Sequence, residues 1–125
     1  TNVILTPHIG GSTQEAQENI GIDAAMKLIN YLDNGSTVGS HTVPELHLPK
    51  QEGTHRILHI HENVPGVMTE INQILSRENI NVVGQYLKTN EEIGYVVLDV
   101  KSFVSQEVVE ELKALKSTIK ARVLY

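Results

Sequence analysis

The fold is decided by the segment HRILHIHENVPGVMTEINQIL, residues 55–75. The first part of this segment alternates around Leu58 and Ile60, which is typical of a strand with one buried face. Pro65-Gly66 follows, and Pro suits the first turn of a helix because the N–H that it lacks would be unpaired there. The apolar residues after this pair recur at helical spacing and are Val67, Ile71, Ile74 and Leu75. The segment therefore predicts a strand, a tight turn and an amphipathic helix.

The rest of the chain completes an alternation of strands and helices. The further predicted elements are a strand over residues 79–87, a turn at 90–92, a strand over 93–100, a helix through Val104, Val108, Val109, Leu112 and Leu115, and a strand over 118–124. The order β-α-β-β-α-β over residues 54–125 is the split βαβ, or ferredoxin-like, arrangement. We therefore predict an α+β fold with a four-stranded antiparallel sheet and two helices on one face of it.

The composition excludes several classes of protein. The chain has 125 residues, 10 Lys and Arg against 15 Asp and Glu, no Cys, no Trp and 4% aromatic residues. An acidic chain with few aromatic residues lacks the basic surface and the stacking side chains of nucleic-acid-binding proteins. No stretch is long and apolar enough for a membrane span, so neither nucleic acid nor a membrane is expected as a partner. The lack of Cys excludes a disulfide scaffold and is compatible with a reducing compartment such as the cytoplasm.

The chain is interpreted as a fragment of a larger protein because it begins inside an apolar run and without Met. Residues 1–5 are expected to form a short buried strand. Ser12-Thr13-Gln14-Glu15 matches a capping box, and the helix that it begins is expected to run to about Asp33, before the stop signal Asn34-Gly35. Residues 36–53 have no periodicity and contain Pro and Gly, which predicts a polar, extended connector.

A candidate binding loop joins the first strand of this domain to its helix. The free amides at the start of the helix after Gly66 favour a carboxylate or a phosphate. The side chain of Asn63 can both donate and accept hydrogen bonds, which suits a zwitterionic ligand. Asn81 begins the next predicted strand and is a candidate for the same end of the sheet. The alternative interpretation is a tight turn with a polar cap.

The histidines of the first strand are candidates for a metal site. His59 and His61 are two residues apart and so point to the same strand face, with His55 before them. His41 or His47 could complete a set of ligands, but nothing in the sequence places a third ligand at a suitable spacing. We therefore predict no metal site and expect solvated or interface histidines.

A second candidate site lies near the beginning of the chain, where residues 6–13 read TPHIGGST. His8 follows the predicted buried strand and precedes Gly10-Gly11 and a helix start, a position that suits a general acid/base. Such a histidine needs a carboxylate to orient it, and Glu15 is assigned to the capping box. The alternative interpretation is a histidine at the end of a strand, in a loop.

Both candidate sites resemble motifs of known families. Residues 6–13 resemble the catalytic-histidine motif of the D-isomer-specific 2-hydroxyacid dehydrogenases, and residues 15–21 continue the match. The pattern His61-x-Asn63-x-Pro65-Gly66-Val67 resembles the ligand loop of an ACT regulatory domain. In this order, and with the ending RVLY, the two motifs are similar to the carboxy-terminal part of a bacterial member of that dehydrogenase family.

The resemblance implies a division of the chain into three parts. Residues 1–35 would be the tail of an α/β catalytic domain, with a strand, the histidine loop and a helix. Residues 36–53 would be a linker or hinge, and residues 54–125 an ACT domain.

The resemblance also implies an activity for the longer protein. It would oxidise 3-phosphoglycerate to 3-phosphohydroxypyruvate with NAD, in the first step of L-serine synthesis. His8 would be the acid/base, and Gly10 and Gly11 match positions near the cofactor. The carboxylate that orients this histidine and the Arg that binds substrate would lie before Thr1, and the sequence has no G-x-G-x-x-G fingerprint. We therefore expect this chain to be inactive as a dehydrogenase by itself.

For the ACT domain, the resemblance implies feedback inhibition by L-serine, bound between the ACT domains of neighbouring subunits of a tetramer. The matching effector residues on one subunit are His61, Asn63, Val64, Pro65, Gly66 and Val67, and Asn81 matches the residue contributed across the interface. Strand 81–86 is apolar enough to be a liability as an unpaired edge, so two copies of the chain are expected to pair edge to edge as a dimer.

Two alternatives remain open. One is a non-enzymatic ACT-domain sensor of another amino acid, with residues 1–35 as a flanking helix. The other is a structural dimerisation module that binds no ligand. Residues 6–13 favour the regulatory part of a dehydrogenase over the sensor, because a free-standing sensor has no use for a catalytic histidine before a Gly-Gly helix start.

Overall fold

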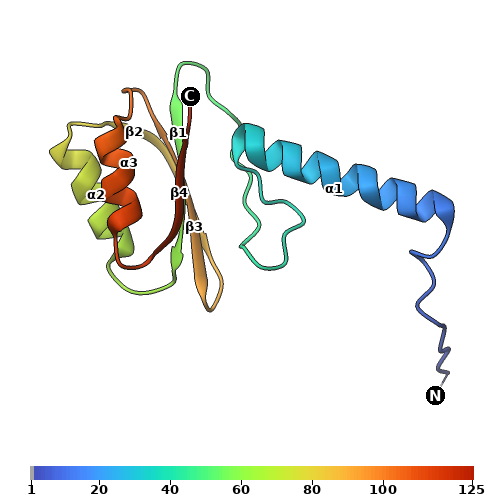
Figure 1. Ribbon diagram of the computed structural model, residues 1–125. Coiled ribbons are helices and arrows are strands. Elements are labelled where there is room, and N and C mark those ends of the chain that lie inside the picture. The colour runs from blue at the N-terminus through green and yellow to red at the C-terminus, as the bar shows by residue number, and fades with distance from the viewer. Residues whose placement is uncertain (1) are drawn as a thin grey trace.

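A four-stranded antiparallel sheet with two helices on one face forms the main body of the protein, and a longer helix extends away from it (Figure 1). The computed structural model describes residues 2–125. The elements are α1 (Gln14–Asn34), β1 (His55–Glu62), α2 (Val67–Arg77), β2 (Val82–Thr89), β3 (Ile93–Val100), α3 (Gln106–Ala114) and β4 (Thr118–Leu124). The predicted βαββαβ order is confirmed, and the strands lie in the order β2-β3-β1-β4.

The direction of the strands decides which loops lie together. Both β1 and β2 pair antiparallel with β3, so they run parallel to each other. The end of β1 therefore lies at the same end of the sheet as the turn between β2 and β3. Asn81, directly before β2, lies at the opposite end, and the expectation that it lies at the same end of the sheet as the β1–α2 loop is wrong. The reason is that α2 carries the chain back along the sheet before the parallel strand begins.

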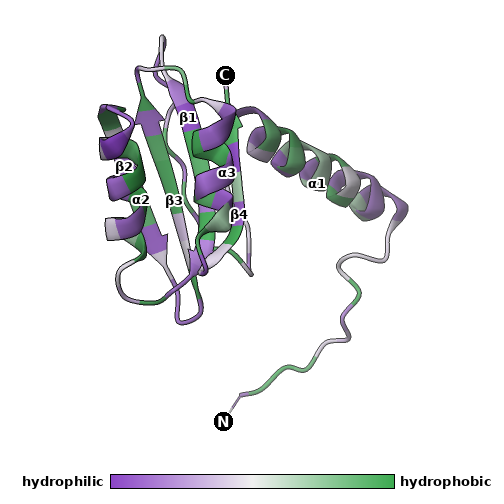
Figure 2. Cartoon of the chain, turned by 60° about the vertical axis from the view of Figure 1, so that its left-hand side comes forward, coloured by the Kyte–Doolittle hydropathy of each residue, from purple (hydrophilic) through white to green (hydrophobic). Residues whose placement is uncertain are grey.

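The main core lies between the sheet and the two helices. It is formed by branched aliphatic side chains, with Ile57, Ile71, Leu98 and Leu112 at most 1% exposed. Each such side chain contributes about 1.5–3 kcal/mol when it leaves water. Figure 2 shows β3 as a mostly hydrophobic strand. This strand is buried on both faces, so something must also cover the side of the sheet away from the helices.

The connector between α1 and β1 covers that second face. Leu46 is buried against Leu58, Tyr95 and Val97 in a second, smaller core. The hydroxyl of Thr37 holds the connector folded, because it donates to the carbonyl of Pro44 at 2.8 Å and accepts from the amide of Leu46 at 2.8 Å. The expectation of a polar, extended connector is therefore wrong, although residues 36–53 contain neither helix nor strand.

A buried ion pair attaches the connector to the sheet. Arg56 and Asp99, both at most 2% exposed, are joined by hydrogen bonds of 2.7 and 2.8 Å. The same guanidinium donates to the carbonyl oxygens of Asn34, Leu48 and Pro49. These bonds use its remaining donors, which is what makes a buried charge tolerable. Arg56 thereby joins the end of α1 and the end of the connector to β1 and β3.

Helix α1 has a different start from the predicted one. The cap is Thr13, whose hydroxyl accepts from the amide of Ala16 at 3.1 Å, so the capping box of Ser12 with Glu15 is wrong by one residue. The predicted stop is confirmed, since Gly35 ends the helix with φ 79°. Among the described residues of α1, none is buried.

The segment before α1 is not the buried strand that was expected. Residues 2–9 are exposed and form neither strand nor helix, and Thr1 lies outside the described residues. Figure 1 shows this segment leading away from the sheet. No helix within residues 2–125 has the length and the apolar character that a membrane crossing requires.

Candidate functional site

The β1–α2 loop, residues 62–67, is tied to the turn between β2 and β3. The amide N–H of Asn63 donates to the carbonyl of Glu92 at 2.8 Å, and its side-chain Nδ2 donates to the carbonyl of Asn90 at 2.8 Å. The turn is itself ordered, because Asn90 Oδ1 accepts from the amides of Glu92 and Ile93. The loop is therefore held by backbone and side-chain bonds before any ligand is present.

Helix α2 begins at this loop with unoccupied amides. Gly66 occupies the cap position with φ 95°, a conformation that favours glycine, and in the described part of the chain no side chain caps the helix. The first-turn N–H groups thus remain available to an anion. Pro65 lies before the cap and not in the first turn of the helix, where it was predicted.

A hollow of about 400 Å³ lies against the start of α2. Its walls are Glu62, Val64, Pro65, Val67, Glu70, Lys116 and Ser117. Lys116 and Ser117 were not among the predicted site residues, because they follow α3, far along the chain. The pairing of β4 with β1 brings them to the loop, and the amide of Glu62 donates to the carbonyl of Ser117 at 2.9 Å.

The histidines of β1 are internal and bonded to each other. His59 and His61 are 0% and 3% exposed, and their Nδ1 atoms are 3.3 Å apart. Nε2 of His59 lies 2.8 Å from Oγ1 of Thr118. Burial, with a smaller contribution from His61, lowers the pKa of His59 to about 4, and burial also lowers the pKa of His61. The expectation of solvated histidines is therefore wrong for His59 and His61.

The histidines do not gather into a metal site. His41 and His47 lie on the connector, which covers the face of the sheet opposite to His59 and His61. Within residues 2–125, no group of three or more His, Cys, Asp or Glu side chains is placed to hold a metal ion. At the start of β1, His55 contacts the rings of Phe103 and Tyr125 edge-on.

The second candidate site is not assembled in this chain. His8 and Gly10 are exposed and Gly11 is half-buried, on the segment before α1. A side chain added at Gly10 would meet nothing within 4 Å. Within residues 2–125, no ion pair involves His8.

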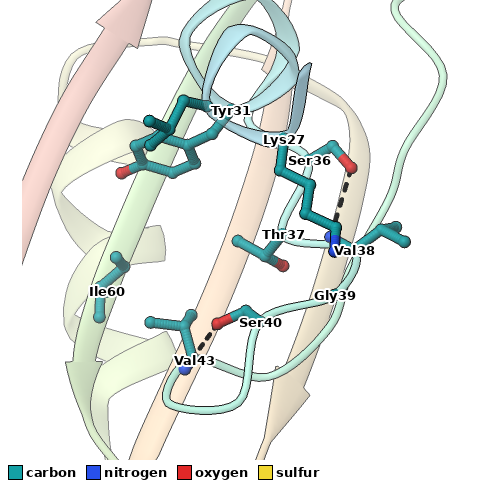
Figure 3. Close-up of a pocket in the computed structure, with 10 residues that line it drawn as sticks. Lys27, Tyr31, Ser36, Thr37, Val38, Gly39, Ser40, Val43 and Ile60 are labelled. Atoms are coloured by element: carbon teal, nitrogen blue, oxygen red, sulfur yellow. Dashed lines mark hydrogen bonds between the residues drawn. The ribbon is translucent and has the colours of Figure 1, made fainter. Parts of the chain in front are cut away.

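Another hollow, of about 290 Å³, lies on the connector side of the sheet (Figure 3). Its walls come from Lys27, Leu28 and Tyr31 of α1, from residues 36–40 and Val43 of the connector, and from Ile60 of β1. Figure 3 shows Val43 and Ile60 lining this hollow together. The sequence analysis did not predict this hollow, because the connector was expected to be polar and extended.

The comparisons with known proteins agree with this geometry. A family model described as "AHAS small subunit-like ACT domain" matches residues 57–120. The chain belongs to the ACT-domain family. The matched region runs from β1 into β4 and contains both the β1–α2 loop and the internal histidines of this ACT domain.

Curated relatives extend the match to the residues before the ACT domain. The chain is 56% identical to D-3-phosphoglycerate dehydrogenase of Haemophilus influenzae over 124 residues, and 52% identical to that of Escherichia coli over 126 residues. A relative of the same name in Dictyostelium discoideum is 48% identical. Each match covers 99% of this chain, and the chain spans 30% of the length of each of these relatives.

Solved structures are similar to part of the chain. The ACT domain from GTP pyrophosphokinase of Chlorobium tepidum has a TM-score of 0.48 and 17% identity, covering 57% of this chain and 96% of that one. The regulatory subunit of aspartate kinase from Thermus thermophilus has a TM-score of 0.49 and 21% identity, covering 58% and 50%.

Proposed function

We propose that this ACT domain is the regulatory domain of a D-3-phosphoglycerate dehydrogenase and binds L-serine as a feedback inhibitor, at a site shared by two copies of the chain. The observation that carries the proposal is the uncapped start of α2 beside Asn63 and His61. The names of the curated relatives supply the enzyme, and the chemistry of the loop supplies the class of ligand.

The loop offers complementary groups to a small amino acid. The first-turn amides of α2, which follow Gly66, are hydrogen-bond donors at the positive end of a helix dipole and suit a carboxylate. The side chain of Asn63 already donates to Asn90, and its oxygen can accept a hydrogen bond from an ammonium or a hydroxyl group. Val64, Pro65 and Val67 give the apolar surroundings that strengthen such bonds.

The strand order supports a site completed by a second copy. β2 is an edge strand, with Tyr86 and Leu87 exposed, so its outer row of N–H and C=O groups can pair with another strand. Antiparallel pairing of two β2 strands places the start of one beside the end of the other. The second copy's Asn81 then lies at the end of the sheet that carries the β1–α2 loop. We therefore propose that the chain dimerises through β2, and that the longer protein is a tetramer.

The longer protein would be the enzyme, with NAD as cofactor, 3-phosphoglycerate as substrate and the cytoplasm as its location. The residues in this chain do not by themselves fit an NAD site, because Gly10 has open space around it and the sequence lacks the dinucleotide fingerprint. His8 would act as the acid/base only beside a carboxylate supplied from outside this chain. The isolated chain is thus expected to show no dehydrogenase activity.

Calorimetric titration of the chain with L-serine tests the regulatory proposal, with D-serine and glycine as controls. Selective L-serine binding should be lost in Asn63→Ala and retained in Asn72→Ala, an exposed asparagine of α2 outside the loop. Sedimentation in the same buffer shows whether the shared site exists. A dimer that ignores L-serine would overturn the proposal, and a dimer that binds another amino acid would favour a sensor of that amino acid.

A further inference from the structure

We infer that His59 and Thr118 are positioning residues: they form a hydrogen-bond chain that holds His61 in one tautomer, with its proton on Nδ1 and the lone pair of Nε2 presented to the ligand. The inference rests on the proposed function, because it concerns how the effector site recognises its ligand. It adds two residues of the hydrophobic interior to the machinery of that site.

The donor in each of these hydrogen bonds can be assigned by starting from the carbonyl oxygen of Leu112. The hydroxyl of Thr118 lies 2.7 Å from the carbonyl oxygen of Leu112, which can only accept, so Thr118 must donate its single proton there. Its oxygen, 2.8 Å from Nε2 of His59, must then accept, and His59 carries its proton on Nε2. A neutral His59 has a bare Nδ1. The facing Nδ1 of His61, 3.3 Å away, must therefore carry the proton of that contact.

Both histidine rings are neutral in this arrangement of hydrogen bonds, and their surroundings favour the neutral state. His59 is fully buried between the sheet and α3, and His61 is nearly so. Two imidazolium ions with facing nitrogens would repel each other in a medium that solvates neither. Burial lowers the pKa of both histidines, in accord with two neutral rings near pH 7.

The remaining nitrogen of His61, Nε2, lies over Gly94 of β3, against the position that a side chain there would occupy. Among residues 2–125, no group is hydrogen-bonded to Nε2 of His61. The side-chain atoms that are both buried and unpartnered in that part of the chain are His55 Nδ1, Ser117 Oγ and Arg122 Nε. Because His61 Nε2 is not one of them, it keeps some access to solvent, at the place where Gly94 has no side chain to cover it.

The fixed tautomer has a consequence for specificity. A bare Nε2 accepts a hydrogen bond and cannot donate one, so His61 selects an ammonium or hydroxyl proton of the ligand and disfavours its carboxylate. The carboxylate is left to the amides of α2. Ligand orientation in the site thus depends on Thr118, a residue of β4 that lies behind the histidines.

Long-range ¹H–¹⁵N correlation spectra of the histidine-labelled chain test the inference directly, because they distinguish a protonated ring nitrogen from a bare one. We expect Nε2–H in His59 and Nδ1–H in His61 without any ligand. A His61 that carries its proton on Nε2 would overturn the inference, whether or not the chain binds L-serine.

A pair of variants at the end of the hydrogen-bond chain tests its positioning role. Thr118→Val keeps the branched shape and removes the hydroxyl, so we expect mixed tautomers in His61 and about fivefold weaker L-serine binding. Thr118→Ser keeps the hydroxyl and should restore both, and Thr6→Val, on the exposed segment before α1, should change neither. Unchanged tautomers in Thr118→Val would overturn the inference.

The two proposals fail in different ways. If the tautomers are those stated but L-serine does not bind to the dimer, the ring protons are correctly assigned and the effector function is overturned. If L-serine binds and the tautomers differ, the effector function stands and the positioning role of His59 and Thr118 is overturned.

Discussion

His61 of β1 lies directly opposite Gly94 of β3, and its imidazole ring fills the space in which a side chain at position 94 would lie. A Cβ atom built on Gly94 would overlap three atoms of that ring. The glycine is needed for space and not for backbone conformation, because Gly94 is not among the residues with positive φ. The pair lies where the two central strands of the sheet meet the loop at which α2 begins.

The first prediction concerns this pair. Gly94→Ala should displace the ring of His61 and lower the free energy of unfolding by about 1–3 kcal/mol, since the surrounding core is closely packed. Urea denaturation measures the loss, and the histidine spectra report the displaced ring. Gly84→Ala is the matched control, because its added carbon would meet Asp99 at an ordinary 3.6 Å. Equal stability of the two variants would contradict the assigned contact.

The second prediction concerns the buried ion pair. Arg56→Met should lower the free energy of unfolding by about 3–5 kcal/mol, because it leaves the carboxylate of Asp99 buried without its partner. The double variant Arg56→Met, Asp99→Leu should recover much of this loss, since neither charge then remains. Urea denaturation of the wild-type chain, the single variant and the double variant measures this order of stability. A double variant less stable than Arg56→Met would contradict it.

The third prediction concerns the connector. Leu46→Ala should lower the free energy of unfolding by about 2–4 kcal/mol, because the side chain is 4% exposed and packs on Leu58, Tyr95 and Val97. Leu28→Ala makes the same change on α1, where the side chain is 64% exposed, and should cost less than about 0.5 kcal/mol. A connector that lies free of the sheet would make the two variants equally stable in urea.

The fourth prediction concerns pH. The pKa of His59 is about 4 in the folded chain and 6.5 as its ordinary value, so the unfolded state binds more protons between these two pH values. The contribution of His59 to stability is thus present above pH 6.5 and is lost as the pH falls toward 4, by on the order of 2–3 kcal/mol.

Urea denaturation at several pH values, compared between the wild-type chain and His59→Phe, measures this effect. Between pH 6.5 and 4, the free energy of unfolding should change less steeply with pH in His59→Phe than in the wild-type chain. This difference reports on both histidines of the pair, because His61 is buried together with His59. His41→Gln, an exposed histidine of the connector, should keep the wild-type slope. If His59→Phe also keeps it, the interior histidines are not neutral.

Local sequence patterns predicted the helices and strands because their signals repeat within a few residues. The stripe of Val67, Ile71 and Ile74 produced α2, and Gly35 ended α1 where expected. The same local reasoning misplaced the cap of α1 by one residue, because Ser12 and Thr13 carry equivalent hydroxyl groups. Only the backbone conformation distinguishes them.

By itself, the sequence determined the βαββαβ order, the loop at which α2 begins, and the two family motifs around His8 and Asn63. Tertiary structure alone decided that the connector covers the sheet, that Asn81 lies at the far end, and that His59 meets Thr118. The physical reason is sequence separation. Periodicity depends on neighbours along a helix or strand, whereas strand register brings together residues 59 positions apart, and no local pattern encodes that pairing.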